Sequence, residues 1–167
     1  MDSFVDAFAA LMNVERGFTD NPIDPGNWTG GRVGVGVCRG TKYGISAARY
    51  PNLDIKNLTL DQARAIAKRD YWDVYHCDQY DPRIGFQVFD AAYNGGHAAR
   101  WLQQAAGADA DGEIGPATVA AVMAADPMKV IMRFDAYRLE YMADIPGNAF
   151  DDGWMRRIAA NLLRGAS

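Results

Sequence analysis

Helical periodicity runs through most of this chain of 167 residues and is lost in one place, the glycine-rich segment at residues 24–46. Within that segment, residues 33–37 read Val-Gly-Val-Gly-Val, and further glycines stand on either side. Such an alternation predicts a small hairpin loosened by glycine rather than a packed sheet. Because almost no other strand signal is present, we expect a mainly α fold of the α+β type, a helical bundle with one small β-hairpin lobe.

An apolar stripe opens the chain and predicts its first helix. Its members are Phe4, Phe8, Leu11 and Met12. Their spacing is that of one helix face, so residues 3–14 are expected to form an amphipathic helix. Glu15 then falls in the last turn, where exposed backbone carbonyls disfavour an anion and, together with burial, favour a protonated carboxyl. The neighbouring Arg16 would oppose this effect if its guanidinium turned toward Glu15.

A second carboxylate, Asp24, follows Glu15 nine positions later in a loop segment. Two carboxyl groups are the minimum equipment for cutting a glycosidic bond, because one must protonate the leaving oxygen while the other supplies a base or a counter-charge. The competing interpretation of Glu15 is a solvated carboxylate at a helix end, the usual situation of a glutamate.

The sequence contains no convincing motif for a nucleotide, a metal ion or another cofactor. The glycines at residues 34–36 lack the third glycine of a dinucleotide fingerprint, and the segment around Lys42 lacks the residues of a P-loop. Cys77 stands beside His76, but a zinc site needs about four ligands. Cys38 and Cys77 are too few for a disulfide framework, and their pairing stays open. We therefore expect neither a metal nor a cofactor.

Three motifs carry a resemblance to a known family. They are Glu15-Arg16-Gly17-Phe18, Asp24-Pro25-Gly26-Asn27-Trp28-Thr29 and Gly40-Thr41-Lys42-Tyr43-Gly44-Ile45-Ser46. This part of the chain resembles the catalytic region of glycoside hydrolase family 108, the phage and prophage endolysins that act as N-acetylmuramidases. The family's usual form is Glu-Gly-Gly-Tyr, then Asp-Pro-Gly-Gly, then Thr-Lys-Tyr-Gly-Ile. Here Arg16 and Asn27 replace glycines, and an insertion at about residues 28–40 separates the second motif from the third.

The resemblance implies a catalytic set of Glu, Asp and Thr similar to that of the phage-type lysozymes. Glu15 is then the catalytic acid and Asp24 the second carboxylate. The threonine is Thr29 by its distance from Asp24 and Thr41 by its Lys-Tyr-Gly-Ile context, and we prefer Thr41. The fold implied is lysozyme-like, with the β-hairpin lobe flanking a substrate cleft. Tyr43, in the third motif, is a candidate substrate-binding residue.

Two helix starts are marked downstream. Thr59 and Gln62 have the spacing of a capping box, and the Asp81-Pro82 pair is expected to open a helix that glycines at residues 95–96 stop.

The end of that second helix holds two more candidate substrate-binding residues. The family likeness implies that Tyr93 and Asn94 lie on the cleft side, where a ring can stack on a sugar and an amide can bind an N-acetyl group. The alternative is that Asn94 is simply a C-cap in left-handed geometry.

A second resemblance covers the rest of the chain. It is carried by Trp101-Leu102-Gln103-Gln104, Asp111-Gly112-Glu113-Ile114-Gly115-Pro116, Arg133, Tyr137, Arg138 and Gly153-Trp154-Met155-Arg156-Arg157. These residues are similar to the helical peptidoglycan-binding-like module of the same family. We therefore expect a lysozyme-like catalytic region at residues 1–96 and a helical region at residues 97–167, packed as one compact unit. The second region either completes the core, which we favour, or binds glycan separately.

Charge bears on the partners. The formal net charge is -4, which argues against nucleic acid. The last helix combines apolar residues with Trp154, Arg156, Arg157 and Arg164, a pattern that suits contact with a membrane or lipopolysaccharide surface. The more common use of such a pattern is a helix docked on the core with solvated arginines. We expect a monomer whose partner is the glycan strand of peptidoglycan.

The N-terminal apolar stretch has no basic start and is too short for the roughly 20 residues of a membrane span. It does not read as a signal peptide. The endolysin likeness then implies a protein that stays in the host cytoplasm until a holin-type lesion releases it to the periplasm and cell wall.

Three functions are compatible with these residues. The first, which the resemblance favours, is hydrolysis of the β-1,4 bond between N-acetylmuramic acid and N-acetylglucosamine, which degrades the bacterial wall for host lysis. The second is a lytic transglycosylase, which acts on the same bond with one glutamate and leaves an anhydro product. The third is a peptidoglycan-binding module without catalysis.

Overall fold

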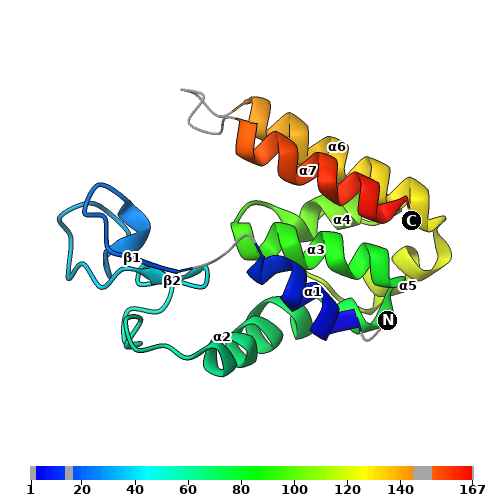
Figure 1. Ribbon diagram of the computed structural model, residues 1–167. Helices are drawn as coiled ribbons and strands as arrows, with labels where there is room; N and C mark the ends of the chain where they lie inside the picture. Colours follow the sequence, from blue (N-terminus) through cyan, green and yellow to red (C-terminus); the bar gives the residue numbers. More distant parts are fainter. Residues whose placement is uncertain (1–2, 14–16, 145–151, 167) are drawn as a thin grey trace. The chain divides into compact units, whose positions relative to one another are not determined.

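The computed structural model describes residues 3–13, 17–144 and 152–166. In this part of the chain seven α-helices accompany one three-stranded antiparallel sheet (Figure 1). The described chain forms two compact units. One is Val5–Arg69, called here the N-terminal unit, and the other is Asp70–Ser167 together with Met1–Phe4, called the helical unit.

The N-terminal unit contains most of α1 (Ser3–Met12), the whole sheet and α2 (Leu60–Ala67). The stripe predicted for α1 is confirmed, since Phe8 and Leu11 are buried. The sheet has the order β1 (Phe18–Thr19), β2 (Thr41–Lys42), β3 (Ile45–Ser46), and a single turn of 3-10 helix, η1 (Pro25–Asn27), lies between β1 and β2 in the chain. All strands are very short, as expected of a lobe with many glycines.

The hairpin of this sheet does not lie where we predicted it. Residues 33–36 form a turn and a bend, because Gly34 and Gly36 have φ of 78° and 81°, outside the β region, and the segment is closed by an isolated antiparallel bridge between Trp28 and Cys38. The hairpin instead joins β2 to β3 through a two-residue turn, Tyr43-Gly44, with φ of 54° and 77°. Two positive φ values in succession are typical of a type I′ turn, whose twist suits two antiparallel strands.

The predicted helix starts are confirmed. Thr59 caps α2 with a complete capping box, in which the Thr59 hydroxyl accepts from the Gln62 N–H and the Gln62 side chain accepts from the Thr59 N–H. Asp81 caps α3 (Pro82–Asn94) by accepting from the Arg83 N–H at 2.9 Å. At the other end of α3, the C-cap alternative for Asn94 is wrong. Asn94 is the last helical residue, and Gly95, with φ of 84°, takes the cap.

The helical unit is built around α3. The other helices are α4 (Ala98–Ala106), α5 (Pro116–Ala124), α6 (Pro127–Ala143) and α7 (Asp152–Gly165), preceded by a short π-helix, η2 (Lys68–Asp73), and a 3-10 turn, η3 (Cys77–Gln79). Helix α6 packs against α3, α4 and α7, and Figure 1 shows α6 and α7 side by side. Edge-on contacts among Phe4, Trp72 and Phe89 begin the core, and Leu102, Phe134 and Ile158 extend it.

These features confirm the predicted fold class, a mainly helical α+β protein with a small β-lobe. Helices α3 and α4, on either side of His97, pack against each other, so the units defined by contacts differ from the sequence regions 1–96 and 97–167. That division stays a prediction about sequence regions. No helix within the described ranges is long and apolar enough to cross a membrane.

Candidate functional site

The predicted catalytic acid, Glu15, lies outside the described residues, as do Val14 and Arg16. The geometry of the site therefore begins with Asp24. Asp24 is the N-cap of η1, and its Oδ1 accepts a hydrogen bond from the Gly26 N–H at 2.8 Å. The residue is exposed, so its carboxylate lies at the surface of the N-terminal unit. A capping bond of this kind fixes the orientation of a side chain that solvent would otherwise leave mobile.

Asn27 connects the Asp24 turn to the strand that carries Thr41. Its side chain is fully buried. Asn27 Nδ2 donates to the Asn21 carbonyl at 3.0 Å, and Asn27 Oδ1 accepts from the Thr41 hydroxyl at 2.7 Å. Its own carbonyl accepts from the N–H groups of Arg39 and Gly40 at 2.9 and 3.1 Å. One buried amide thus holds the two ends of the insertion together.

Sequence reasoning missed this role and treated Asn27 only as a replacement of a family glycine. The available signal was the pairing of an amide with a long insertion directly after it, since an insertion needs something to fasten its two ends. A glycine at position 27 has no side chain with which to reach Asn21 or Thr41.

The hydroxyl groups of the two candidate threonines, Thr29 and Thr41, form different hydrogen bonds. Thr29 lies within the insertion, where its hydroxyl accepts from the Val37 N–H at 2.9 Å and its own N–H donates to the Val37 carbonyl at 3.0 Å. Thr41 lies on β2, half-buried, with its hydroxyl on Asn27. The Thr29 hydroxyl therefore helps to close the insertion, whereas the Thr41 hydroxyl belongs to the same network as the Asp24 turn.

Tyr43 occupies the first position of the β2–β3 turn. Its φ of 54° is uncommon for a residue with a side chain, and a bulky residue held there stores backbone strain. Its ring is half-exposed and has the Lys42 ammonium at 5.4 Å from the ring centroid. Strain retained at a turn is often found at functional sites, where the side chain needs to be presented in one direction.

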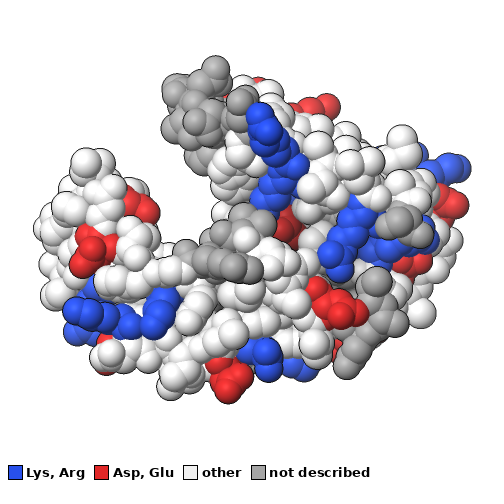
Figure 2. Space-filling model, viewed as in Figure 1, with Lys and Arg blue, Asp and Glu red and all other residues white. Residues whose placement is uncertain are grey.

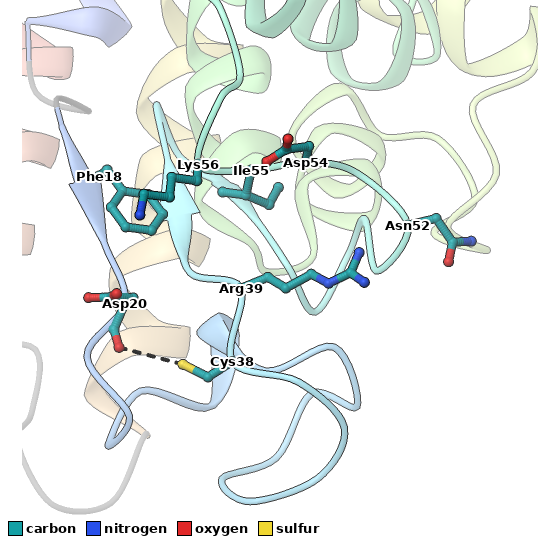
Figure 3. A pocket seen from close by; sticks show the side chains of 8 residues that line it. All are labelled: Phe18, Asp20, Cys38, Arg39, Asn52, Asp54, Ile55 and Lys56. Carbon is teal, nitrogen blue, oxygen red and sulfur yellow. Dashed lines mark hydrogen bonds between the residues drawn. The ribbon is translucent and has the colours of Figure 1, made fainter.

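A pocket of about 530 Å³ opens in the N-terminal unit (Figure 3), called here the polar pocket. It is lined by Phe18, Asp20, Cys38, Arg39, Asn52, Asp54, Ile55 and Lys56. Hydrogen bonds from the side chain and the backbone of Asn57 hold the pKa of Asp54 below its usual value. Neither cysteine forms a disulfide in the described part of the chain; the Cys38 thiol donates to the Asp20 carbonyl at 3.5 Å, and Cys77 is buried. Of the residues predicted for the catalytic site, the two that the structure describes, Asp24 and Thr41, do not line this pocket.

Tyr93 and Asn94 belong to the helical unit, at the C-terminal end of α3. The Tyr93 ring is buried, with centroid distances of 4.7 Å to Tyr71 and 5.8 Å to Phe89. Asn94 Nδ2 donates to the Asp90 carbonyl one turn back, at 2.7 Å. Tyr93 is thus part of an aromatic core, and Asn94 is tied to its own helix.

Asn94 also lines a second pocket, of about 250 Å³, called here the aromatic pocket. Its lining comprises Asn94, Gly95, Gly96, Trp101, Tyr141, Met142 and Trp154. The rings of Trp101 and Tyr141 lie with centroids 5.4 Å apart. The lining residues come from the end of α3, from α4, from the end of α6 and from the first turn of α7, and none of them carries a formal charge.

A buried charge cluster lies beneath α7. Asp90 Oδ2 accepts from Arg138 at 2.9 Å and from Asn161 at 2.8 Å, and Asp90 Oδ1 accepts from Arg157 Nη2 at 2.8 Å. Burial alone would raise the pKa of Asp90, but the charges of Arg157 and Arg138 and the hydrogen bonds outweigh it and lower that pKa. Asp135 is also fully buried, and burial raises its pKa to about 7.

This cluster bears on the arginines of the last helix. Helix α7 is docked on the core through the buried Ile158, as the more common use of its pattern predicts. Its arginines are not all solvated, however, because Arg157 binds Asp90 and the Arg164 guanidinium lies 4.2 Å from the centroid of the Phe86 ring. Contact of this helix with a membrane or lipopolysaccharide surface through Trp154, Arg156, Arg157 and Arg164 stays a prediction.

No group of three or more potential ligand side chains among the described residues could hold a metal ion. Figure 2 shows basic and acidic side chains interspersed on the viewed face, with no large field of one sign.

Comparison with known proteins places the chain in a family. Residues 8–96 match the family model described as glycosyl hydrolase 108, and residues 97–159 match that of a predicted peptidoglycan domain. No curated protein matches. Among solved structures, the fold is similar to that of Brucella abortus SagA, with a TM-score of 0.81 and a sequence identity of 26%. The match covers 98% of this chain and 93% of that chain. The chain belongs to the glycosyl hydrolase 108 family and is a glycosidase that acts on peptidoglycan.

Proposed function

We propose that the protein is an N-acetylmuramidase, which hydrolyses the β-1,4 bond between N-acetylmuramic acid and N-acetylglucosamine. Glu15 is the acid that protonates the glycosidic oxygen. Asp24 is the second carboxylate, which either activates a water molecule or stabilises the positive charge of an oxocarbenium-like transition state. The observation that carries the proposal is the Asn27 network, because it joins the Asp24 turn to Thr41 through one buried side chain.

The network supports this assignment on physical grounds. A general base or a counter-charge must be held within fractions of an ångström of its working position. The Gly26 N–H orients Asp24 by a hydrogen bond at 2.8 Å, and the Asn27 amide fixes the strand on which Thr41 lies. Because the Thr29 hydroxyl binds the backbone of the insertion, Thr41 is the better candidate for the catalytic threonine.

The other proposed substrate-binding residues are Tyr43 and Asn94, which contact the sugar, and Tyr93, which acts indirectly because its ring is buried. The Tyr43 ring, presented by a strained turn, is suited to stacking on a sugar face. The Asn94 amide is suited to the acetamido group, and Tyr93 supports the helix end from the core.

The biological role we propose is that of an endolysin. The protein would act as a monomer, remain in the host cytoplasm and reach the wall through a holin-type lesion. Expression in bacteria with and without a separately supplied holin tests this role. Lysis should require both proteins, and lysis by this protein alone, or none with both, would contradict it.

The bond specificity is tested by mass spectrometry of the muropeptides released from purified sacculi. A muramidase releases products with a reducing N-acetylmuramic acid end. An anhydro end would identify a lytic transglycosylase, and binding to sacculi without any fall in turbidity would identify a binding module. The anomer formed first, read by proton nuclear magnetic resonance, distinguishes the two roles of Asp24, since a base gives inversion and a stabilised intermediate gives retention.

Two variants test the residues. Glu15→Gln should lower the rate of product release by about 10²–10⁴-fold, the usual contribution of a positioned acid. Asp24→Asn should lower it strongly as well, whereas a lytic transglycosylase needs no second carboxylate. Asp20→Asn, a change of the same kind at an exposed position four residues earlier, is the matched control and should retain activity. Equal losses in Asp20→Asn and Asp24→Asn would contradict the assignment.

A further inference from the structure

The aromatic pocket is suited to a neutral ligand. Among the residues that the structure describes, its lining includes three aromatic rings, one amide and two glycines, but no acidic or basic side chain. An anionic ligand would have to leave water there without a cation from the described lining to pair with, which is costly. The polar pocket differs in this respect, because Arg39 and Lys56 line it.

Two rings of the aromatic pocket, Trp101 and Tyr141, are held in place by contacts with neighbouring rings. Trp101 is almost buried, and its ring meets that of Phe134 edge-on at 6.0 Å. Tyr141 lies 5.1 Å from the His97 ring and 5.4 Å from the Trp101 ring, yet 37% of the residue stays exposed. Rings that are ordered before binding lose little entropy when a ligand stacks on them.

The floor of the pocket needs glycine. At Gly96, with φ of 121°, an added Cβ would lie 2.6 Å from the edge of the Trp101 ring. Gly95 and Gly96 are both exposed, so backbone polar groups lie next to the rings. The Asn94 amide adds a group that can both donate and accept hydrogen bonds. The aromatic rings therefore suit the apolar face of a ligand, and the glycine backbone and the Asn94 amide suit its polar edge.

The volume limits the size of that ligand. At about 250 Å³, the pocket lies below the range of about 300–1,000 Å³ that is typical of sites for larger small molecules. One pyranose ring with its substituent is the unit of a glycan strand that suits such a space. Peptidoglycan offers two kinds of group, neutral acetamido sugars and stem peptides that carry carboxylates.

We propose that the aromatic pocket binds one neutral acetamido sugar of the glycan strand, and that the helical unit thereby recognises sugar rather than stem peptide. The choice of an acetamido sugar rests on the proposed function. The sugar's apolar face stacks on Tyr141 and Trp154, and its acetamido group reaches the Asn94 amide and the glycine backbone. Binding is then independent of the stem peptide that the wall carries.

The test uses the full chain with Glu15→Gln and three probes, methyl N-acetyl-β-glucosaminide, methyl β-glucosaminide and the free stem peptide. Binding is followed by the chemical shifts of the tryptophan indole N–H groups during titration. We expect saturable binding of the first probe, in the millimolar range of a single sugar, at least tenfold weaker binding of the deacetylated probe and no saturation by the peptide. Tighter binding of the peptide than of the acetylated sugar would overturn the proposal.

Two further variants locate the binding. Tyr141→Ala should weaken binding of the acetylated probe at least tenfold, whereas Tyr137→Ala, one turn earlier on α6 and outside the lining, should not. Because either variant could lose its fold, saturation-transfer spectra of the unmodified pocket provide a second test, in which the acetyl methyl protons should receive magnetisation from aromatic protons. No transfer to that methyl would overturn the proposal.

The binding experiments can fail or succeed independently of the experiments that test the muramidase proposal. Muropeptide products decide which bond the protein cuts, whether or not Tyr141 matters. Sugar binding by the Glu15→Gln chain decides what the pocket holds, whether or not Glu15 is the acid. If an acetamido sugar binds equally to the Tyr141→Ala chain, the pocket proposal fails while the muramidase proposal stands.

Discussion

The two units use aspartate in opposite ways. In the N-terminal unit, Asp24 is exposed and its Oδ1 accepts one hydrogen bond, from a backbone N–H. In the helical unit, Asp90 is 3% exposed and both of its oxygens are bound by Arg138, Arg157 and Asn161. A carboxylate enclosed by cations stabilises the fold but has no oxygen left for a reaction. The comparison indicates that charge in the helical unit is structural, whereas charge near Asp24 is available for chemistry.

The largest effect that tests this contrast is expected for Asp90→Asn. The change leaves the buried guanidinium of Arg138 and the partly buried one of Arg157 without their counter-charge, and breaking a buried pair in this way costs about 3–5 kcal/mol. Chemical denaturation, read by far-ultraviolet circular dichroism, measures the free energy of unfolding. We expect a loss of that size, or a chain that no longer folds at 37 °C.

The matched control for Asp90 is the exposed pair in the N-terminal unit, Arg64 and Asp61, at 3.6 Å. Exposed pairs contribute about 0–1 kcal/mol, so Asp61→Asn should leave the midpoint of denaturation almost unchanged. Similar losses in both variants would show that the two units do not differ in their use of charge.

The next effect concerns pH. Asp135 is fully buried, and neither of its carboxyl oxygens has a hydrogen-bond partner in the described part of the chain. Burial, helped by the charge of Asp90 and opposed by that of Arg138, raises its pKa to about 7 from 3.8. The folded protein therefore holds a proton that the unfolded chain releases, and its stability should fall as the pH rises from about 4 to about 7. Asp90, with its lowered pKa, acts in the opposite sense and loses its contribution below pH 3.8.

Asp135→Asn checks this slope, because asparagine has the shape of the neutral acid and does not ionise. At pH 8 the variant should be more stable than the parent chain by a few kcal/mol, and at pH 4 the two should be nearly equal. Glu140→Gln, at an exposed position of the same helix, removes the same charge and should leave the slope unchanged. A slope unaffected by Asp135→Asn would assign the pH dependence to other groups.

A smaller effect distinguishes two of the buried amides, Asn27 of the N-terminal unit and Gln103 of the helical unit. Asn27→Ala leaves the Thr41 hydroxyl and the Asn21 carbonyl without their partner, at a cost of about 1–3 kcal/mol. If the Asn27 network holds the site, the rate of muropeptide release should also fall at temperatures where the variant is folded. Gln103→Ala is the counterpart in the helical unit, where Gln103 Nε2 donates to Asp111 at 2.6 Å and Gln103 Oε1 accepts from the Gly112 N–H at 2.8 Å. It should lower stability to a similar extent and leave the rate unchanged.

The elements that the sequence predicted correctly are those set by neighbouring residues. The capping box at Thr59 spans four residues, and the start of α3 depends on Asp81 and Pro82 alone. The misplaced hairpin shows the limit of such local patterns. Alternating valines predicted a small, glycine-loosened hairpin at residues 33–37, but an alternation does not reveal that Gly34 and Gly36 adopt positive φ and turn the chain.

The interactions that no local pattern indicated are those between distant residues. Thr41 and Asn27 are 14 positions apart, and Asn161 and Asp90 are 71 apart. The docked-helix interpretation treated Arg157 as solvated. The periodicity of α7 shows which face is apolar, but it does not show that Arg157 forms an ion pair with Asp90 of α3. For the candidate site, family motifs pointed to Asp24 and Thr41, whereas the amide that joins them appeared only once the chain was folded.

The smallest effect is expected at Tyr43, the strained residue in the β2–β3 turn of the N-terminal unit. Asn-Gly is the preferred pair for a type I′ turn, so Tyr43→Asn should relieve strain and raise the free energy of unfolding by up to about 1 kcal/mol. Loss of the contact with the Lys42 ammonium offsets part of this gain, by about 0.5 kcal/mol. If the strain serves to present the ring to a sugar, the rate of muropeptide release should fall in the same variant. Tyr43→Phe keeps the ring and the strain, and should keep both stability and rate. A Tyr43→Asn chain that is more stable and equally active would show that the strained turn has no part in binding, and would restrict the chemistry of the N-terminal unit to the Asn27 network.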